Sequence, residues 1–291
     1  MAVAIAIALL VLGSIAFHVM SPWWRTPLAS NWGSIDSALT ITMWICAVAF
    51  VLLNLFLAYA LFRYRQRDGH RAHYEPENTR LEKRLTFWTA IGIAGMLAPG
   101  LLAWNRFVNV PKDAAIVEAT GQQWQWSYRF PGADGVLGTS DVSHITPDNP
   151  FGLNPQDPYG RDDRLIETSE LHLPLNKPVK VLLRSKDVLH DFYVPEFRAR
   201  MDMVPGIITY FWLTPTRPGT YEILCAELCG VGHYMMRGTV IVEPEPKFRA
   251  WLAKQSTYAQ LSATAAPAAA ELAEAQNAPP PNAVDQPRGK R

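Results

Sequence analysis

The hydrophobic pattern divides the chain into an apolar N-terminal third and a longer part where short apolar runs alternate with turns. Residues 37–62 and 85–105 contain no Asp, Glu, Lys or Arg. An α-helix rises about 1.5 Å per residue, so either segment is long enough to cross a hydrocarbon core of about 30 Å. The pattern therefore predicts a transmembrane helical hairpin over residues 37–108.

The segment between the two spans, residues 63–84, contains a cluster of Lys and Arg. Basic loops remain in the cytoplasm, so this loop is predicted to be cytoplasmic and the chain after residue 108 to lie outside the membrane. Residues 1–24 form a further apolar segment. It begins without the Lys or Arg of an ordinary signal peptide, which favours a retained transmembrane helix, but both interpretations stay open.

From residue 109 the pattern changes to short extended runs rich in Val, Ile, Tyr, Trp and Thr, bounded by Pro, Gly, Asn and Asp. Residues 177–185 (KPVKVLLRS) and 238–244 (GTVIVEP) are examples. Several such runs without a helical period are typical of an antiparallel sandwich or barrel. The predicted fold class is therefore a mainly β extramembrane domain, residues 109–254, behind an α-helical membrane anchor.

Two segments depart from this regular pattern. Residues 131–163 form a Gly/Pro/Asp/Asn-rich insert, which is expected to be a functional surface loop or partly disordered. Residues 255–291 are rich in Ala and Pro and offer too little apolar surface to offset the entropy of ordering, so a disordered tail is predicted.

Charge and cysteine content narrow the classes of function. The formal net charge is +1, which gives no electrostatic footprint for nucleic acid. There are three cysteines, too few for a disulfide scaffold. Cys46 lies within an apolar span, where a thiol behaves as a small hydrophobic group. Cys225 and Cys229 stand close together in a polar segment and indicate a metal or redox site.

Residues 225–236 (CAELCGVGHYMM) contain the strongest chemical signal. Two thiols, an imidazole and a thioether are the soft ligands that copper prefers in electron-transfer sites. Zinc and a Cys225–Cys229 disulfide are the competing interpretations. On this spacing alone copper is favoured and the other two stay open. Upstream, His190 alone is a weak signal, and His144 and His172 receive no role.

Together, these segments resemble a known family. His190 followed by DFYVPEFRARMDMVPG, the CAELCGVGHYMM segment and the aromatic segment around Trp124 resemble cytochrome c oxidase subunit II, whose members carry a dinuclear copper centre called CuA. The apolar hairpin matches that family's membrane anchor. The resemblance covers about residues 20–250 and implies a cupredoxin-like β-barrel.

The resemblance also implies the ligands of two copper ions. The thiolates of Cys225 and Cys229 would each bridge both ions. His190 would bind one ion, with Met236 as its weak ligand. The other ion would be bound by His233 and, weakly, by the backbone carbonyl of Glu227. The Glu227 carboxylate would serve a magnesium site shared with subunit I.

The same resemblance makes Trp124 the point at which electrons arrive from cytochrome c. Trp126 and Tyr128 are expected on the same strand face as Trp124, with Tyr128 in the core. Asp187 and Asp191 are expected, on weaker grounds, to attract a basic cytochrome. Gln125 departs from the family pattern, which often has an aromatic residue between the two tryptophans.

The implied function is that of subunit II of a cytochrome c oxidase in a bacterial inner membrane, with the copper domain in the periplasm. It would pass single electrons from cytochrome c to haem in subunit I, for the reduction of oxygen to water coupled to proton pumping. The expected partners are subunit I, other oxidase subunits, cytochrome c and membrane lipid. A CuA subunit of a nitric oxide reductase and a membrane-tethered copper carrier are the alternatives.

Overall fold

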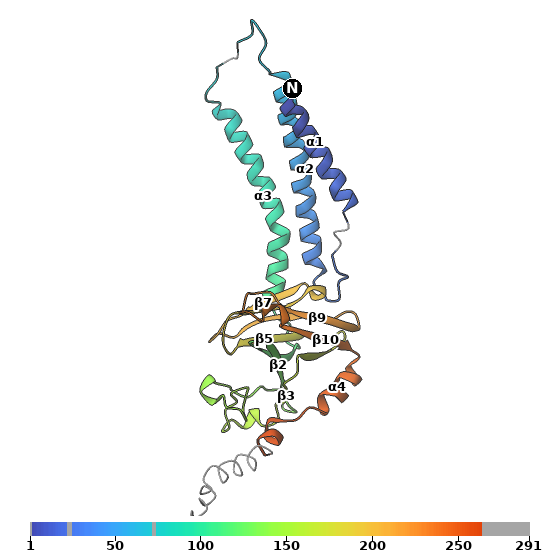
Figure 1. Cartoon of the computed structure of the whole chain (residues 1–291), viewed down its shortest axis with the longest axis vertical. Coiled ribbons are helices and arrows are strands. Elements are labelled where there is room, and N and C mark those ends of the chain that lie inside the picture. The colour runs from blue at the N-terminus through green and yellow to red at the C-terminus, as the bar shows by residue number, and fades with distance from the viewer. Residues whose placement is uncertain (1, 22–24, 72–73, 264–291) are drawn as a thin grey trace, which may run out of the picture.

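Three long helices lead into a β domain (Figure 1). The structure is a computed structural model that describes residues 2–21, 25–71 and 74–263. The helices are α1 (Ala2–Met20), α2 (Gly33–Arg63) and α3 (Thr79–Val108). By length and composition, all three could cross a membrane. Residues 22–24, at the end of the first predicted segment, lie outside the described residues.

The loop between α2 and α3 and the β domain lie at opposite ends of the helices (Figure 1). In a membrane, the basic residues of this loop would therefore lie on the opposite side from the β domain. This arrangement agrees with the orientation expected from the basic cluster.

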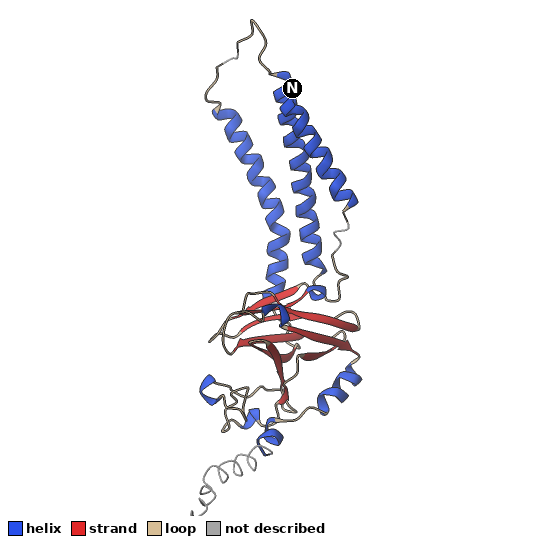
Figure 2. Cartoon of the chain, viewed as in Figure 1, coloured by secondary structure: helices blue, strands red, loops and turns tan. Residues whose placement is uncertain are grey.

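The β domain contains two sheets of five strands each (Figure 2). The first has the order β3-β2-β1-β5-β8 and the second the order β4-β10-β9-β6-β7. The strands of the first sheet are β1 (Ala115–Gln122), β2 (Gln125–Phe130), β3 (Arg164–Ile166), β5 (Val179–Ser185) and β8 (Thr209–Leu213). Those of the second are β4 (Glu170–Pro174), β6 (His190–Val194), β7 (Ala199–Met203), β9 (Gly219–Cys225) and β10 (Arg237–Glu243).

The sheets are mixed, which corrects the purely antiparallel arrangement expected from the sequence pattern. β1 pairs with β5 in parallel, and β10 pairs with β4 in parallel. Parallel neighbours need a long connection between them. The connection from β1 to β5 includes the insert, and the connection from β4 to β10 runs through β5 to β9. Along β5, Val179, Val181 and Leu183 point inward and are buried, and each such side chain contributes about 1.5–3 kcal/mol.

The segment that precedes α2 fixes the anchor to the β domain. The Ala29 amide donates to the Glu196 carbonyl over 2.8 Å, and the Thr216 amide donates to the Ala29 carbonyl over 2.9 Å. Trp32 is buried, and its Nε1 donates to the Trp212 carbonyl over 2.9 Å. The orientation of α2 is therefore coupled directly to the second half of the domain.

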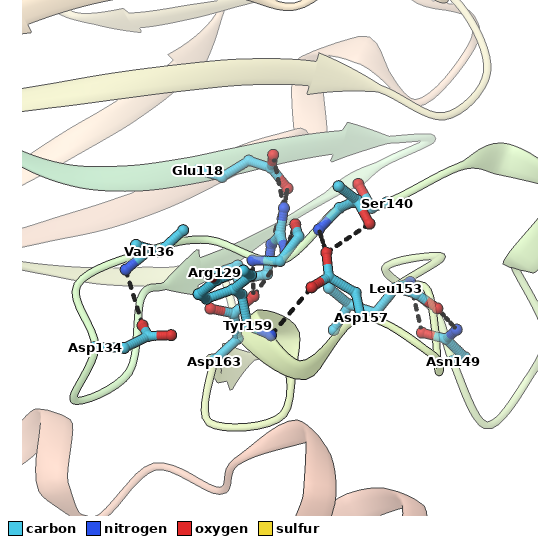
Figure 3. Close-up of polar contacts among 12 residues, drawn as sticks. Glu118, Arg129, Asp134, Val136, Ser140, Asn149, Leu153, Asp157, Tyr159 and Asp163 are labelled. Atoms are coloured by element: carbon cyan, nitrogen blue, oxygen red, sulfur yellow. Dashed lines mark hydrogen bonds and ion pairs between the residues drawn. The ribbon is translucent and has the colours of Figure 1, made fainter.

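The insert is ordered, which favours the surface loop over the partial disorder among the two alternatives expected from the sequence (Figure 3). Arg129, at the end of β2, lies between Glu118 of β1 and Asp163 of the insert. Phe151 and Leu153 of the insert form a small second core. A loop of this composition is ordered because a buried cation and its own apolar side chains hold it to the sheet.

The chain after helix α4 (Glu245–Ala253) is ordered beyond residue 255, which corrects the predicted start of the tail. The Leu165 amide donates to the Ser256 carbonyl over 3.1 Å, and the Tyr258 amide donates to the Asp163 carbonyl over 3.0 Å. Tyr258 is buried in the second core. These aromatic and backbone contacts offset the ordering entropy that the Ala-rich composition alone does not. Residues 264–291 of the predicted tail lie outside the described residues.

Candidate metal centre

Two neighbouring strands and one loop carry the predicted copper ligands. Cys225 is the last residue of β9, and His190 is the first residue of the adjacent strand β6. Phe192 of β6 is paired with Cys225, so His190 lies close to the end of β9. Cys229, His233 and Met236 follow in the β9–β10 loop. Strand pairing thus brings together residues that are far apart in the sequence.

The side-chain donor atoms converge. The two sulfur atoms of Cys225 and Cys229 lie 3.7 Å apart, beyond the S–S bond length of about 2.05 Å in a disulfide. The Cys225 sulfur lies 3.9 Å from Nδ1 of His190, and the Cys229 sulfur lies 3.5 Å from Nδ1 of His233. Each thiol therefore has an imidazole nitrogen of its own.

The predicted weak ligands join the same cluster. The Met236 sulfur lies 3.8 Å from the Cys229 sulfur, and the Glu227 carbonyl oxygen lies 3.2 Å from the Cys225 sulfur. Met236 is 1% exposed, whereas the neighbouring Met235 is 58% exposed and belongs to the surface. The structure thus brings together all six predicted donors and separates them from Met235.

The chemistry of the donor set fits copper. Two thiols, two imidazoles and a thioether form a soft set, which matches copper in electron-transfer sites. Within the described part of the chain, the group of metal-ligand type with donor atoms inside 4.8 Å of one another is His190, Cys225 and Cys229. Two imidazoles and two thiols at this spacing also suit zinc, but the buried thioether favours copper.

Asp187 holds the His190 ring in position. Its Oδ1 lies 2.8 Å from Nε2 of His190, which leaves Nδ1 directed at Cys225. A carboxylate on the far nitrogen of a ligating histidine fixes the tautomer and the ring orientation. Burial raises the pKa of Asp187, but hydrogen bonds from the Gln123 amide and from His190 bring it below its usual value. The sequence analysis missed this role, although the Asp-x-x-His spacing carried a signal for it.

The two thiols differ in acidity. Burial raises the pKa of the Cys225 thiol, but contacts with His190 and the backbone lower it by a larger amount. The net shift of this pKa is therefore downward. Burial and the neighbouring Cys225 raise the pKa of Cys229. The pair thus gives up one proton readily and holds the other, which a metal ion would have to displace.

Trp124 lies beside the ligand loop, but not on a strand. It occupies the turn between β1 and β2, so the expectation that it shares a strand face with Trp126 and Tyr128 is wrong. Trp126 and Tyr128 are both buried in the core, as expected for Tyr128. The indole Nε1 of Trp124 lies 3.4 Å from the Cys229 carbonyl oxygen and donates to it.

Glycines in the ligand loop make room for Trp124. A Cβ atom at Gly232 would lie 2.3 Å from Cδ2 of the Trp124 ring, so only glycine fits against the ring here. Gly230 has a φ of +123°, in the region that favours glycine. The sequence analysis missed these two roles because a glycine in a loop does not by itself show what it packs against.

The two acidic residues near His190 differ in exposure. The burial of Asp191 corrects its expected attraction of a basic cytochrome, whereas Asp187 is exposed, so for Asp187 that attraction stays a prediction. Asp191 is buried, and Arg200 Nε donates to its Oδ2 over 3.2 Å. Asp187 is bonded to His190 and to the Gln123 amide. Both carboxylates are therefore engaged within the domain.

Comparisons with known proteins agree with this geometry. The family model described as "Cytochrome C oxidase subunit II, periplasmic domain" matches residues 115–243. An "Alternative cytochrome c oxidase subunit 2" of Bradyrhizobium diazoefficiens is 59% identical over 262 residues, which cover 90% of this chain and 95% of the relative. The chain belongs to the cytochrome c oxidase subunit II family.

Two further matches have lower sequence identity to this chain. "Cytochrome c oxidase subunit 2" of Cereibacter sphaeroides is 29% identical over 247 residues, 80% of this chain and 79% of the relative. The crystal structure of the periplasmic domain of subunit II from Bradyrhizobium japonicum is 27% identical, covers 50% of this chain and 95% of that chain, and gives a TM-score of 0.37. Family membership makes the chain subunit II of a haem–copper oxidase, with a cupredoxin-like β domain and apolar helices suited to a membrane anchor.

Proposed function

We propose that this subunit II binds two copper ions as a CuA centre and accepts single electrons from a cytochrome c. The observation that carries the proposal is the convergence of the donors, since the two cysteine sulfurs lie 3.7 Å apart and each has an imidazole nitrogen within 3.9 Å. The proposed ligands are His190, Cys225, Glu227 through its carbonyl, Cys229, His233 and Met236. The Glu227 carboxylate is then left for a magnesium site shared with subunit I.

A copper pair held by Cys225, Cys229, His190 and His233 would supply a one-electron carrier whose bonds change little between its two oxidation states, because the charge would be shared between metal and sulfur. The protein supplies a rigid and dry setting for this chemistry. His190, Cys229 and Met236 are buried, and the carboxylate of Asp187 fixes the His190 ring. Such outer contacts tune the potential and the metal affinity.

Trp124 is the side chain through which electrons would arrive. It is half-buried, so one part of the ring is open to a docked protein while its Nε1 contacts the carbonyl of Cys229. A haem edge placed against this ring would thus be separated from a copper ligand by a single side chain.

The anchor and the domain define the place of the subunit in the complex. In this proposal residues 37–108 anchor the subunit in a bacterial inner membrane, residues 109–254 form the periplasmic copper domain and α1 is retained as a third membrane helix. Electrons pass to haem in subunit I, where oxygen is reduced to water with proton pumping. Burial of the copper donors disfavours a carrier protein, which needs an exchangeable site.

The test is a metal count and an electron paramagnetic resonance (EPR) spectrum of the purified full-length chain after copper loading. Two copper ions per chain, with the hyperfine pattern of one electron shared equally by two copper nuclei, are expected. A single copper with the pattern of one nucleus, or a bound zinc ion in its place, would contradict the proposal.

A further inference from the structure

The turn between β1 and β2 contacts the metal centre at two separate points, and Gln123 takes part in both. Its backbone amide donates to Oδ2 of Asp187 over 2.7 Å. The other oxygen of this carboxylate holds His190. The backbone of Gln123 is therefore bonded to the carboxylate that orients the first predicted ligand.

The Gln123 side chain reaches the opposite part of the site. Its Nε2 donates to the Cys229 carbonyl oxygen over 2.7 Å, and the Trp124 indole donates to the same oxygen over 3.4 Å. A carbonyl oxygen has two lone pairs and can accept both. The shorter distance makes the Gln123 bond the stronger of the two.

The ligand loop is shaped to receive these two side chains. A Cβ atom at Gly230 would lie 2.9 Å from the Gln123 Nε2, and one at Gly232 would overlap the Trp124 ring. The Gln123 and Trp124 side chains of the turn thus pack directly against the glycine backbone of the ligand loop. The hydrogen bond from the Gln123 side-chain amide to the Cys229 carbonyl is the strongest directional contact between the turn and the loop.

We propose that Gln123 is a positioning residue for electron delivery, because its side-chain amide holds the Cys229 carbonyl and thereby fixes the Trp124 ring against the ligand loop. This inference rests on the proposed function. Electron transfer slows steeply as the gap between donor and acceptor widens, so the orientation of Trp124 controls the rate. Gln123 touches neither the cytochrome nor the metal in this role and acts through Trp124 and Cys229.

The experiment uses the copper-loaded full-length chain and its Gln123→Leu variant, which keeps the backbone bond to Asp187 but loses the side-chain donor. The control is Gln125→Leu, since Gln125 is exposed and its side chain makes no hydrogen bond within the described residues. Two rates are measured, namely the oxidation of reduced cytochrome c and the reduction of the chain by a small diffusing reductant. The metal count and the EPR spectrum are recorded for each protein.

Gln123→Leu is expected to slow cytochrome c oxidation about fivefold, the change in population that one lost hydrogen bond produces. Its rate with the small reductant, its two copper ions and its spectrum should match the wild type. Gln125→Leu should change none of these. A Gln123→Leu variant with the wild-type cytochrome rate would overturn the inference, as would one that loses copper or slows equally with both reductants.

A Gln123→Glu variant adds a test of the hydrogen bond itself. A protonated carboxyl group can donate to the Cys229 carbonyl, whereas a carboxylate cannot. The cytochrome rate of Gln123→Glu, relative to Gln125→Glu, should therefore recover as the pH is lowered through the titration of the new carboxyl group, and a flat ratio would contradict the role. A wild-type chain without a copper pair would instead contradict the proposed function, so the two failures are distinguishable.

Discussion

Two of the buried polar clusters in the β domain differ in how closely their side chains are bonded to one another. Arg129 is 2% exposed and donates to Glu118 over 3.0 Å and to Asp163 over 2.7 Å (Figure 3). In the copper cluster, the nearest contacts between cysteine and histidine donors are 3.5 and 3.9 Å. The first cluster is closed by hydrogen-bonded ion pairs, while the second brings donors together without bonding them tightly to one another.

The two clusters have different roles because their side chains carry different charges. Carboxylates and a guanidinium neutralise one another, so the Arg129 cluster attaches the insert to the sheet without an external ligand. Thiols and imidazoles at van der Waals distance have no such mutual neutralisation, and a cation fits between them. The first cluster thus stabilises the fold, and the second is arranged for a metal.

The largest expected effect comes from removing the thiols. The double variant Cys225→Ser/Cys229→Ser should bind no copper pair and should lose all stabilisation by copper. Free copper at about a thousandfold excess over its dissociation constant should stabilise the wild type by about 4 kcal/mol. Thermal unfolding with and without copper measures the difference. The matched control Cys46→Ser, in α2, should behave as the wild type, and a double variant that is still stabilised by copper would break the contrast between the clusters.

The next largest effect should come from the ion-pair cluster. Arg129→Met leaves two buried carboxylates without their cation and should lower the free energy of unfolding by about 3–5 kcal/mol. Arg237→Met is the control, because Arg237 pairs with Glu222 over 2.7 Å at the surface and its loss should cost about 0–1 kcal/mol. Denaturant unfolding of the full chain measures both. Equal losses for the two variants would show that the buried cluster has no special role.

The copper cluster could be predicted from the sequence, largely because five of its six donors lie within residues 225–236. Cys225, Cys229, His233 and Met236 have diagnostic types and spacing, and His190 was added through the family resemblance. The long apolar helices could be predicted equally well, since the core helix of a soluble protein rarely stays free of charged residues over such a length. In both cases the information is local in the sequence.

The Arg129 cluster could not be predicted in this way. Glu118 and Arg129 face each other across β1 and β2, but Asp163 arrives from the far end of the insert. None of these residues is unusual in its own segment, so the sequence could not decide between a surface loop and partial disorder for the insert. The position of Trp124 was also missed, because the alternation of Trp and Gln at the start of β2 continues back into the turn without a change in pattern.

A pH titration tests the role of Asp163 in the Arg129 cluster. Burial raises the pKa of Asp163 to about 6 from an ordinary 3.8, in spite of Arg129 beside it. Its Oδ1 has no hydrogen-bond partner within the described part of the chain. The folded chain therefore holds this proton more tightly than the unfolded chain, and protonation favours folding. That contribution is present below about pH 4 and is lost as the pH rises through about 6.

The variant Asp163→Asn cannot titrate at this position. The free energy of unfolding of the wild type relative to Asp163→Asn should therefore fall by about 1–3 kcal/mol between pH 4 and pH 6. Denaturant unfolding at a series of pH values measures this difference. A difference that rises with pH would mean that Arg129, rather than burial, controls this carboxyl group.

The smallest expected effect distinguishes two adjacent methionines. Met236 is buried with its sulfur 3.8 Å from Cys229, whereas Met235 is exposed. Met236→Leu conserves volume and should change the free energy of unfolding by less than about 1.5 kcal/mol. If the thioether is a weak ligand, the variant should keep both copper ions, lower the copper affinity by about tenfold and shift the reduction potential. Met235→Leu should change neither quantity. Equal potentials for all three proteins would mean that the Met236 sulfur only packs against the site, because a side chain that merely fills space is replaced by leucine without an electronic effect.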